Sequence, residues 1–212
     1  MPRKTKEDAR LTREKILKGA LQVFVKKGFS NTTLQDIARH IGMTRGAVYW
    51  HFKDKQDLAT AMIAEMMEKE AAYVKGAIQP TGSLDDIIAN LMARLDYVDA
   101  NPEMRQFVFF MSFQVEWATE RQINIPAKEN PFRHGPFGNI YDLLVSAREA
   151  GEIRPEVDLL QVHDIITGLY MGLVRLEFSG KSQTPLRSNL EWAAKAVIDS
   201  IRSEGSGSLQ GN

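Results

Sequence analysis

The stretch TTLQDIARHIGMTRGAVYWHFKDK, residues 32–55, decides the fold of the N-terminal part of this chain. Thr33 and Asp36 make a capping box, and Gly42 suits the left-handed conformation that often ends a helix. Thr44 then caps a second short helix eleven residues after the first cap. Between the first cap and the glycine, apolar residues recur at the spacing of one helix face, namely Leu34, Ile37, Ala38 and Ile41.

The second of these helices carries side chains that are too large and polar to serve only as core. They are Arg45, Tyr49, Trp50, His51, Lys53 and Lys55, whereas its apolar contacts are few: Ala47, Val48 and Phe52. Two short helices joined by a glycine turn, the second of them rich in Arg, Tyr, His and Lys, describe a helix-turn-helix. In this motif the second helix enters the major groove of DNA.

The chain from Thr12 to Leu58, TREKILKGALQVFVKKGFSNTTLQDIARHIGMTRGAVYWHFKDKQDL, resembles the N-terminal DNA-binding domain of the TetR family of transcriptional regulators. Its wording TRGAVYWHF, residues 44–52, is most similar to the branch that represses multidrug-efflux operons, the acriflavine-resistance-regulator type. The resemblance covers residues 10–70. Beyond them only helix pattern and length agree, because the ligand domains of this family diverge widely.

The charges of the chain are segregated, although its formal net charge is zero. Residues 1–60 hold 13 Lys and Arg against 6 Asp and Glu, and the remainder holds 14 against 21. A basic end on an acidic body is typical of a protein that presents one face to phosphates. Taken alone, the same split also fits a solvated basic terminus without a partner. The presence of a helix-turn-helix favours the first interpretation, with DNA as the partner.

Each polar residue of the motif has an expected role on DNA. Thr33 and Thr44 lie at helix N-termini, where a hydroxyl and free backbone N–H groups hold a phosphate. Arg45 is the candidate for a bidentate contact to guanine, and Gln35 is a second candidate base reader. Gly46 lacks a side chain, so the backbone of the first turn can approach DNA closely.

Expected roles also follow for four further residues of the motif. Tyr49, His51 and Lys55 look like phosphate contacts, and the family pattern supports these roles at these positions. Trp50 has two open interpretations, a contact with the DNA backbone or packing between the motif and the preceding helix. The remaining apolar residues are expected to be core only, namely Leu34, Ile37, Ala38, Val48 and Phe52.

The pattern of the whole chain is all-α, and it divides into three parts. A helix-turn-helix domain is expected over residues 10–70, a helical ligand-binding and dimerisation domain over 71–202, and a flexible Gly/Ser-rich tail over 203–212. No segment reads as a β-strand. The first expected helices are residues 12–27, the two helices of the motif, and a long helix after Asp54. Further helices are expected after Ser83, after Asn101-Pro102, and at about 138–150, 158–178 and 185–202. A Pro/Gly-rich loop is expected at 122–138.

The helix after Pro102 is apolar around nearly its whole circumference, so it is expected to be buried on every side or to line a cavity. An apolar cavity of this kind suits drug-like molecules, and the resemblance favours a ligand site over an ordinary core rich in Phe and Met. The candidate ligand-binding residues are Phe107, Phe110, Met111, Gln114, Trp117, Phe137, Tyr141 and Met171. Polar groups near this region are Arg105, Glu116, His134, His163 and Asp164, and an unpaired Glu among aromatic residues would suit a cationic ligand.

The last two helices carry apolar stripes that predict either intrachain packing or a dimer interface. Leu190 and Val197 lie in the stripe of the last helix, and Gly168 and Gly172 allow close backbone approach on the helix before it. A single helix-turn-helix makes too few groove contacts for useful affinity, so such proteins pair on two-fold operators. The resemblance implies a homodimer through the two C-terminal helices.

Several other classes of protein are disfavoured. The chain has no cysteine, its four His residues lack metal-ligand spacing, and none of the common nucleotide-binding or hydrolase motifs occurs. We therefore expect no catalytic residues, no metal site and no cofactor. The charged N-terminus and the lack of 18 consecutive apolar residues predict a cytoplasmic protein with no membrane partner.

Together these features predict a dimeric, ligand-responsive repressor. It would bind palindromic double-stranded operator DNA, be released by a small hydrophobic or cationic effector, and control an efflux operon. The alternative is a related regulator without a small-molecule effector, which senses a protein, activates, or shapes DNA. Operator affinity that no hydrophobic effector changes would favour the alternative.

Overall fold

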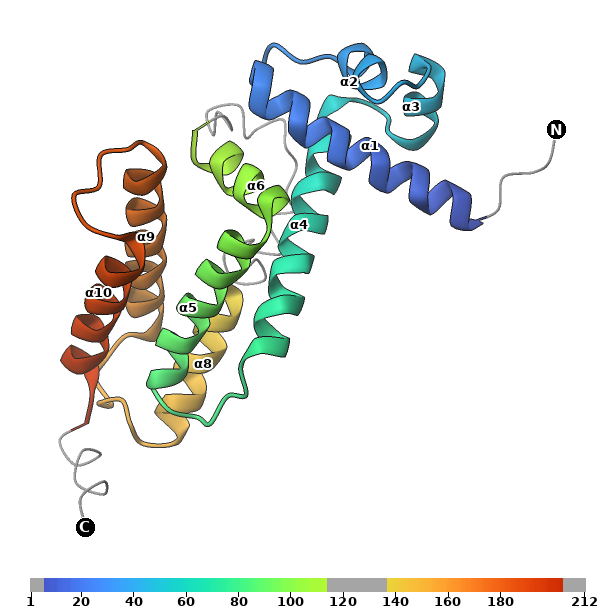
Figure 1. Ribbon diagram of the computed structural model, residues 1–212. Helices are drawn as coiled ribbons and strands as arrows, with labels where there is room; N and C mark the ends of the chain where they lie inside the picture. The colour runs from blue at the N-terminus through green and yellow to red at the C-terminus, as the bar shows by residue number, and fades with distance from the viewer. Residues whose placement is uncertain (1–5, 114–136, 204–212) are drawn as a thin grey trace. The chain divides into compact units, whose positions relative to one another are not determined.

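The computed structural model describes residues 6–113 and 137–203 of the chain. Within these residues every regular element is a helix, as the sequence predicted, and the only β pairing is an isolated bridge between Ile153 and Arg202. Most of the loop expected at 122–138, and residues 204–212 of the expected tail, lie outside the described residues. The helices (Figure 1) are α1 Lys6–Lys27, α2 Leu34–His40, α3 Arg45–His51, α4 Lys55–Ala77, α5 Asp85–Ala100, α6 Pro102–Phe113, α8 Gly138–Glu149, α9 Leu159–Phe178 and α10 Leu186–Ile201.

Contacts divide the described chain into two compact units. The first comprises residues 6–68 and 101–113, and the second comprises residues 69–100 and 137–203. The division falls inside α4, after Glu68. By its contacts, however, α6 belongs with the first unit, although the sequence grouped it with the later helices.

The first unit is built on the apolar face of α1. Ile16, Leu21 and Phe24 are buried there, and the ring of Phe24 stacks on that of Phe110 in α6 with centroids 5.5 Å apart. Gly28, at φ +81°, ends α1 in a conformation that side chains rarely adopt. The predicted helix therefore forms, and it begins at Lys6, earlier than expected.

Gly19 on α1 allows α2 to approach closely. A Cβ atom added there would lie 2.1 Å from Cγ2 of Ile41, at the end of α2, a distance that requires one of the two to move. Because Ile is branched at Cβ, that methyl group is held close to the backbone and has little freedom to move aside. Packing of α1 on the helix-turn-helix thus requires glycine at position 19, which the sequence analysis did not single out.

The expectation that the helix after Pro102 is buried on every side is wrong for its described part. Met104, Phe107 and Phe110 are buried, but Val108 and Phe109 are only half-buried and Phe113 is exposed. The reason is that α6 packs on α1 through one face, as a surface helix does. An apolar circumference therefore did not imply a completely buried helix.

In the second unit α10 packs against α9 and α5, and α8 packs against the same two helices. The inner stripe of α10 is used within the chain, where Leu190, Ala194, Ile198 and Ile201 are all buried. Packing within one chain, one of the two interpretations of this stripe, therefore holds for these residues. A charge at Leu190 would disrupt the core of the unit, so this position cannot report on a dimer interface.

Candidate nucleic-acid interface

The helix-turn-helix predicted from residues 32–55 is present with its local signals. The Thr33 hydroxyl accepts from the Asp36 N–H at 3.2 Å, and the Asp36 carboxylate accepts from the Thr33 N–H at 3.0 Å, which completes the capping box. Gly42 turns the chain at φ +70°. The Thr44 hydroxyl then accepts from the Ala47 N–H at 3.2 Å and starts α3. The predicted turn and both caps are confirmed.

The inner faces of α2 and α3 hold the two helices together. These helices pack on each other, so the motif has a small core of its own. The five residues predicted to be core only are all buried: Leu34, Ile37, Ala38, Val48 and Phe52. Burial of these side chains fixes which face of α3 points outward.

The outward face of α3 presents the groups that the sequence assigned to DNA. Thr44, Arg45 and Gly46 are exposed in its first turn, and Tyr49 follows one turn later. One Nη of Arg45 donates to the Tyr49 hydroxyl at 3.1 Å, and the guanidinium lies 5.0 Å from the centre of the Tyr49 ring. This pairing holds the guanidinium on the outer surface of α3 before any DNA is bound.

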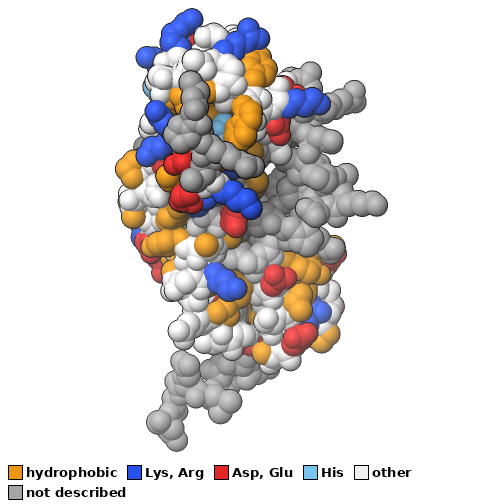
Figure 2. All heavy atoms as spheres, turned by 90° about the vertical axis from the view of Figure 1, so that its right-hand side faces the viewer, with side chains coloured by type: hydrophobic (Ala, Val, Ile, Leu, Met, Phe, Trp, Pro, Cys, Tyr) orange, Lys and Arg blue, Asp and Glu red, His pale blue; other side chains and the backbone are white. Residues whose placement is uncertain are grey.

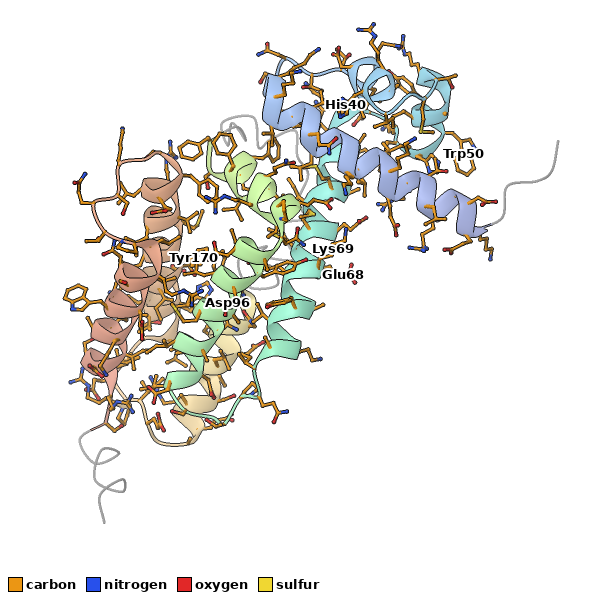
Figure 3. All side chains as sticks on the ribbon, in the orientation of Figure 1. His40, Trp50, Glu68, Lys69, Asp96 and Tyr170 are labelled. Atoms are coloured by element: carbon orange, nitrogen blue, oxygen red, sulfur yellow. The ribbon has the colours of Figure 1, made fainter. Side chains whose placement is uncertain are left out.

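Trp50 is 72% exposed and projects from α3 (Figure 3). Its ring meets the His51 ring edge-on, with centroids 4.6 Å apart. Of the two open interpretations of Trp50, packing between the motif and the first helix is wrong, because such a ring would be covered. The ring lies on the surface beside half-buried His51, so contact with the DNA backbone is the interpretation that stays a prediction.

Gly46 yields a prediction in which stability and binding change in opposite directions. In the described chain nothing lies within 4 Å of a Cβ added at Gly46, and its φ is not positive, so folding does not require glycine there. Gly46→Ala should stabilise α3 by up to about 1 kcal/mol. It should nevertheless weaken operator binding, because the added methyl group keeps the backbone from DNA. Thermal unfolding and operator titration measure the two effects, and unchanged affinity would contradict the assigned role.

Arg45→Ala should reduce affinity for the cognate operator by roughly 1–3 kcal/mol and relax the base preference at one position of each half-site. The reason is loss of a bidentate contact to one guanine. Selection from a randomised operator before and after the change measures the preference directly. Lys53→Ala is the matched control, because Lys53 is also exposed, lies beyond the end of α3, and should affect all sequences alike. An unaltered preference in Arg45→Ala would make Arg45 a phosphate contact.

The start of α2 is tied to the end of α1 by a pair that the sequence analysis missed. Lys27 Nζ lies 2.7 Å from the Asp36 carboxylate, and the Thr33 hydroxyl donates to the same carboxylate at 2.7 Å. These bonds, that from Lys27 foremost, hold the pKa of Asp36 well below its ordinary value. The Thr33 hydroxyl, predicted to contact a phosphate, is therefore already engaged within the protein, while neighbouring Gln35 is exposed.

Lys55 is partly committed to the protein itself. Its ammonium donates to the carbonyl oxygens of Phe29, at 2.7 Å, and Ser30, at 3.2 Å, and lies over the Phe29 ring. Partial burial lowers the pKa of the Lys55 ammonium. Since an ammonium has three N–H donors, the phosphate contact predicted for Lys55 would use the remaining one.

The surface of this unit is rich in basic side chains. Figure 2 shows Lys and Arg side chains gathered at one end of the view, with apolar rings among them. This agrees with the positive balance of residues 1–60. Such a surface favours binding to a polyanion, and the resulting affinity should decrease with salt.

The residues predicted to bind a ligand are distributed over both units. Phe107, Phe110 and Met111 belong to the first, where Phe110 has the surroundings of a core side chain. In the second, the partly exposed Phe137 packs edge-on against Tyr170 with centroids 5.1 Å apart, and partly exposed Tyr141 lies near His163. The remaining predicted residue of the second unit, Met171, is exposed, whereas Gln114 and Trp117 lie outside the described residues.

The polar groups expected near the ligand region do not form one site either. His163 is buried, with Nε2 3.3 Å from the Phe137 carbonyl oxygen, whereas Asp164 and Arg105 are exposed. Glu116 and His134 lie outside the described residues. The sequence analysis missed a different polar group, centred on Arg94. The sequence feature that could have revealed this group is Arg94 itself, a charged residue that lies among apolar Ile87, Leu91, Leu95 and Val98 of α5.

The described fold and interface define a helix-turn-helix DNA-binding protein with a separate helical unit beyond α4. The family described as bacterial regulatory proteins, tetR family, matches residues 16–62. The transcriptional regulator SrpR of Pseudomonas putida is 31% identical over 185 residues, which are 86% of this chain and 83% of SrpR. The chain therefore belongs to the TetR family of transcriptional regulators.

One further relative agrees with the branch suggested by TRGAVYWHF, and one solved structure shares the fold. The transcriptional regulator AcrR of Shigella flexneri is 57% identical over 58 residues, which are 27% of each chain. The structure of SmeT with triclosan has a TM-score of 0.77 at 22% identity and covers 92% of this chain and 93% of SmeT. SmeT is the repressor of a multidrug efflux pump of Stenotrophomonas maltophilia. In the described residues no helix is long and apolar enough to span a membrane.

Proposed function

We propose that this protein is a homodimeric repressor that binds a palindromic operator and is released by a small hydrophobic effector. The observation that carries the proposal is the outward face of α3, with Arg45, Gly46 and Tyr49 exposed next to a closed core. The proposed target genes encode an efflux system, by analogy with SmeT, which represses an efflux pump. The proposed location is the cytoplasm, where DNA is accessible.

An exposed apolar stripe on α9 supports the dimer. Ile165, Gly168, Gly172 and Leu176 follow one face of the helix, and the two large side chains are 45% and 46% exposed. In the described chain nothing lies within 4 Å of a Cβ added at either glycine. Each glycine lowers helix stability by about 1 kcal/mol relative to Ala, so their presence on an open face favours close approach by a second subunit.

The effector response would be transmitted through α4. This helix begins next to α3 and continues into the second unit, so it is a covalent, regular connection between the two. A dimer must hold its recognition helices about 34 Å apart, or a multiple of one helical turn, to enter successive major grooves. An effector that tilts α4 would alter this spacing. By linkage, operator DNA must then weaken effector binding by the same factor.

The test begins with the operator. Full-length protein is used to select binding sites from random DNA, and the expected product contains two inverted half-sites with centres about one helical turn apart. Triclosan and other hydrophobic compounds are then screened for operator release. Selection of a single, unrepeated half-site would refute the dimeric mode. Operator affinity that no tight-binding compound changes would instead favour a regulator without a small-molecule effector.

A further inference from the structure

The second unit contains a buried polar cluster, which we define as Glu70, Asn90, Arg94, Thr167 and Tyr170. These residues come from α4, α5 and α9, and each is at least nine-tenths buried. Figure 3 shows Tyr170 on α9, on the side that faces α5. A group of this size inside a helical core is unusual, because polar atoms lose hydrogen bonds to water when they are buried.

Arg94 uses the acceptors of the cluster. Its Nε donates to Asn90 Oδ1 at 3.0 Å, and one Nη donates to Asn139 Oδ1, at the start of α8, at 2.7 Å. The other Nη, Nη1, lies 3.2 Å from a carboxylate oxygen of Glu70. The guanidinium is therefore neutralised by Glu70, and both Asn side-chain oxygens point toward it.

The atoms left over are an amide nitrogen and two hydroxyls, each of which can donate a hydrogen bond. Asn90 Nδ2 and the hydroxyls of Tyr170 and Thr167 are buried without a hydrogen-bond partner among the described residues, whereas Arg94 Nη1 is held in the ion pair with Glu70. The orientation of the Asn90 amide follows from its bond to Arg94, because Oδ1 must face the guanidinium N–H and Nδ2 must face away. Leaving a buried donor without an acceptor is unfavourable, so the cluster has a chemical preference for an acceptor.

The cluster is bordered by an aromatic ring at the start of α8. The Phe137 ring lies 4.8 Å from the Arg94 guanidinium carbon and 5.1 Å from the Tyr170 ring. Phe137 and Asn139 are the partly exposed neighbours of the cluster, and α8 begins at Phe137 without a side-chain cap. The first turn of α8 is thus the side from which an aromatic molecule would reach these donors.

We propose that this cluster recognises the effector, and that the effector is an aromatic molecule with a hydrogen-bond-accepting oxygen rather than a cation. The inference rests on the proposed function, which it deepens by assigning a ligand class. An acceptor oxygen would take the free N–H group of Asn90 and the free O–H group of Tyr170, and the aromatic ring would lie beside Phe137. A cation is disfavoured, because the carboxylate of the cluster, Glu70, already pairs with Arg94.

A matched set of probes tests the ligand class. Benzophenone has two phenyl rings and a carbonyl acceptor, diphenylmethane has the rings without the acceptor, and tetraphenylphosphonium is an aromatic cation. Binding of each to the full-length protein is measured by calorimetry, apart from any effect on DNA. Benzophenone should bind at least tenfold more tightly than the other two. Equal or tighter binding of diphenylmethane or the cation would overturn the proposal, as would a lack of any binding by benzophenone.

Two substitutions test the site. Tyr170→Phe removes only the unpartnered hydroxyl, so the free protein should be as stable as before or more stable. Its affinity for benzophenone should nevertheless fall about three- to tenfold, since one hydrogen bond is lost. Asn90→Asp keeps an oxygen for Arg94 but removes the Nδ2 donor, and it should lower the benzophenone affinity while raising that of tetraphenylphosphonium. Tyr73→Phe is the control, because Tyr73 is an exposed tyrosine of the same unit.

A cluster that only supports the fold would give the opposite pattern. Tyr170→Phe and Asn90→Asp would then leave benzophenone affinity at the level of Tyr73→Phe, and the assignment would be wrong. Operator release is measured separately. Benzophenone that binds through these residues without releasing the operator would refute the effector-responsive repressor but leave the binding site standing. Release that is insensitive to both substitutions would refute the site alone.

Discussion

Replacement of Arg94 by Leu should lower the free energy of unfolding by about 3–5 kcal/mol, because it leaves the Glu70 carboxylate buried without its counter-charge. Arg94 is fully buried and Glu70 is 5% exposed, so water cannot take over the lost contact. The side-chain oxygens of Asn90 and Asn139 would lose a donor at the same time. Urea unfolding of the full-length protein measures the change.

The loss of stability in Arg94→Leu should depend on pH. Burial raises the pKa of Glu70, and Arg94 opposes this rise, so Arg94→Leu should raise that pKa further. A carboxyl whose pKa is higher in the folded protein than in the unfolded chain favours folding when it is protonated. That contribution is present below the unfolded pKa and is lost as pH increases through the folded pKa. The variant should therefore be relatively less stable at about pH 8 than at about pH 5.

Two further variants test whether the buried charge of Glu70 causes the loss of stability in Arg94→Leu. Glu70→Gln combined with Arg94→Leu removes the carboxylate, so most of the stability and all of the added pH dependence should be restored. Arg187→Leu breaks an exposed pair with Asp96 in the same unit, and it should change stability by no more than about 1 kcal/mol. A pH-independent loss in Arg94→Leu would mean that packing, and not the charge of Glu70, explains the effect.

Leu176→Glu should convert the proposed dimer to a monomer and reduce operator affinity by at least about 100-fold. Leu176 is 46% exposed in the single chain, so a carboxylate there stays hydrated in a monomer. In a two-fold interface the same position would be buried in both subunits, which costs several kcal/mol. Affinity falls because each monomer reaches only one half-site. Analytical ultracentrifugation and operator titration measure the two consequences.

Leu160→Glu is the matched control for this interface. Leu160 is on the same helix and is 43% exposed, but it lies about 160° around α9 from Leu176 at 3.6 residues a turn. It should leave both association and operator affinity near their original values. A Leu176→Glu protein that stays dimeric would place the interface elsewhere on the surface. Loss of dimer in both variants would show that any charge on α9 is disruptive.

The sequence by itself determined the parts of this protein that depend on local interactions. The Thr33–Asp36 capping box, the Gly42 turn and the Thr44 cap each involve residues within a few positions of one another, so they were readable before any packing was known. Most residues that face outward on α3 followed from their size and polarity, whereas the exposure of Trp50 did not follow from the sequence. The family followed from the same residues, because a helix-turn-helix must preserve its turn and caps to keep the recognition helix in place.

Only the tertiary structure decided which apolar faces are covered and which polar groups are buried. Leu190 and Leu176 both belong to apolar stripes, yet Leu190 is core and Leu176 is open. The sequence sets Arg94 among apolar residues of α5 but does not show what pairs with it, and contacts with Glu70 and Asn139 hold it inside. Gly19 owes its importance to Ile41, which lies 22 positions away. These properties arise between distant segments, whose approach depends on how whole helices pack and not on the periodicity of any one of them.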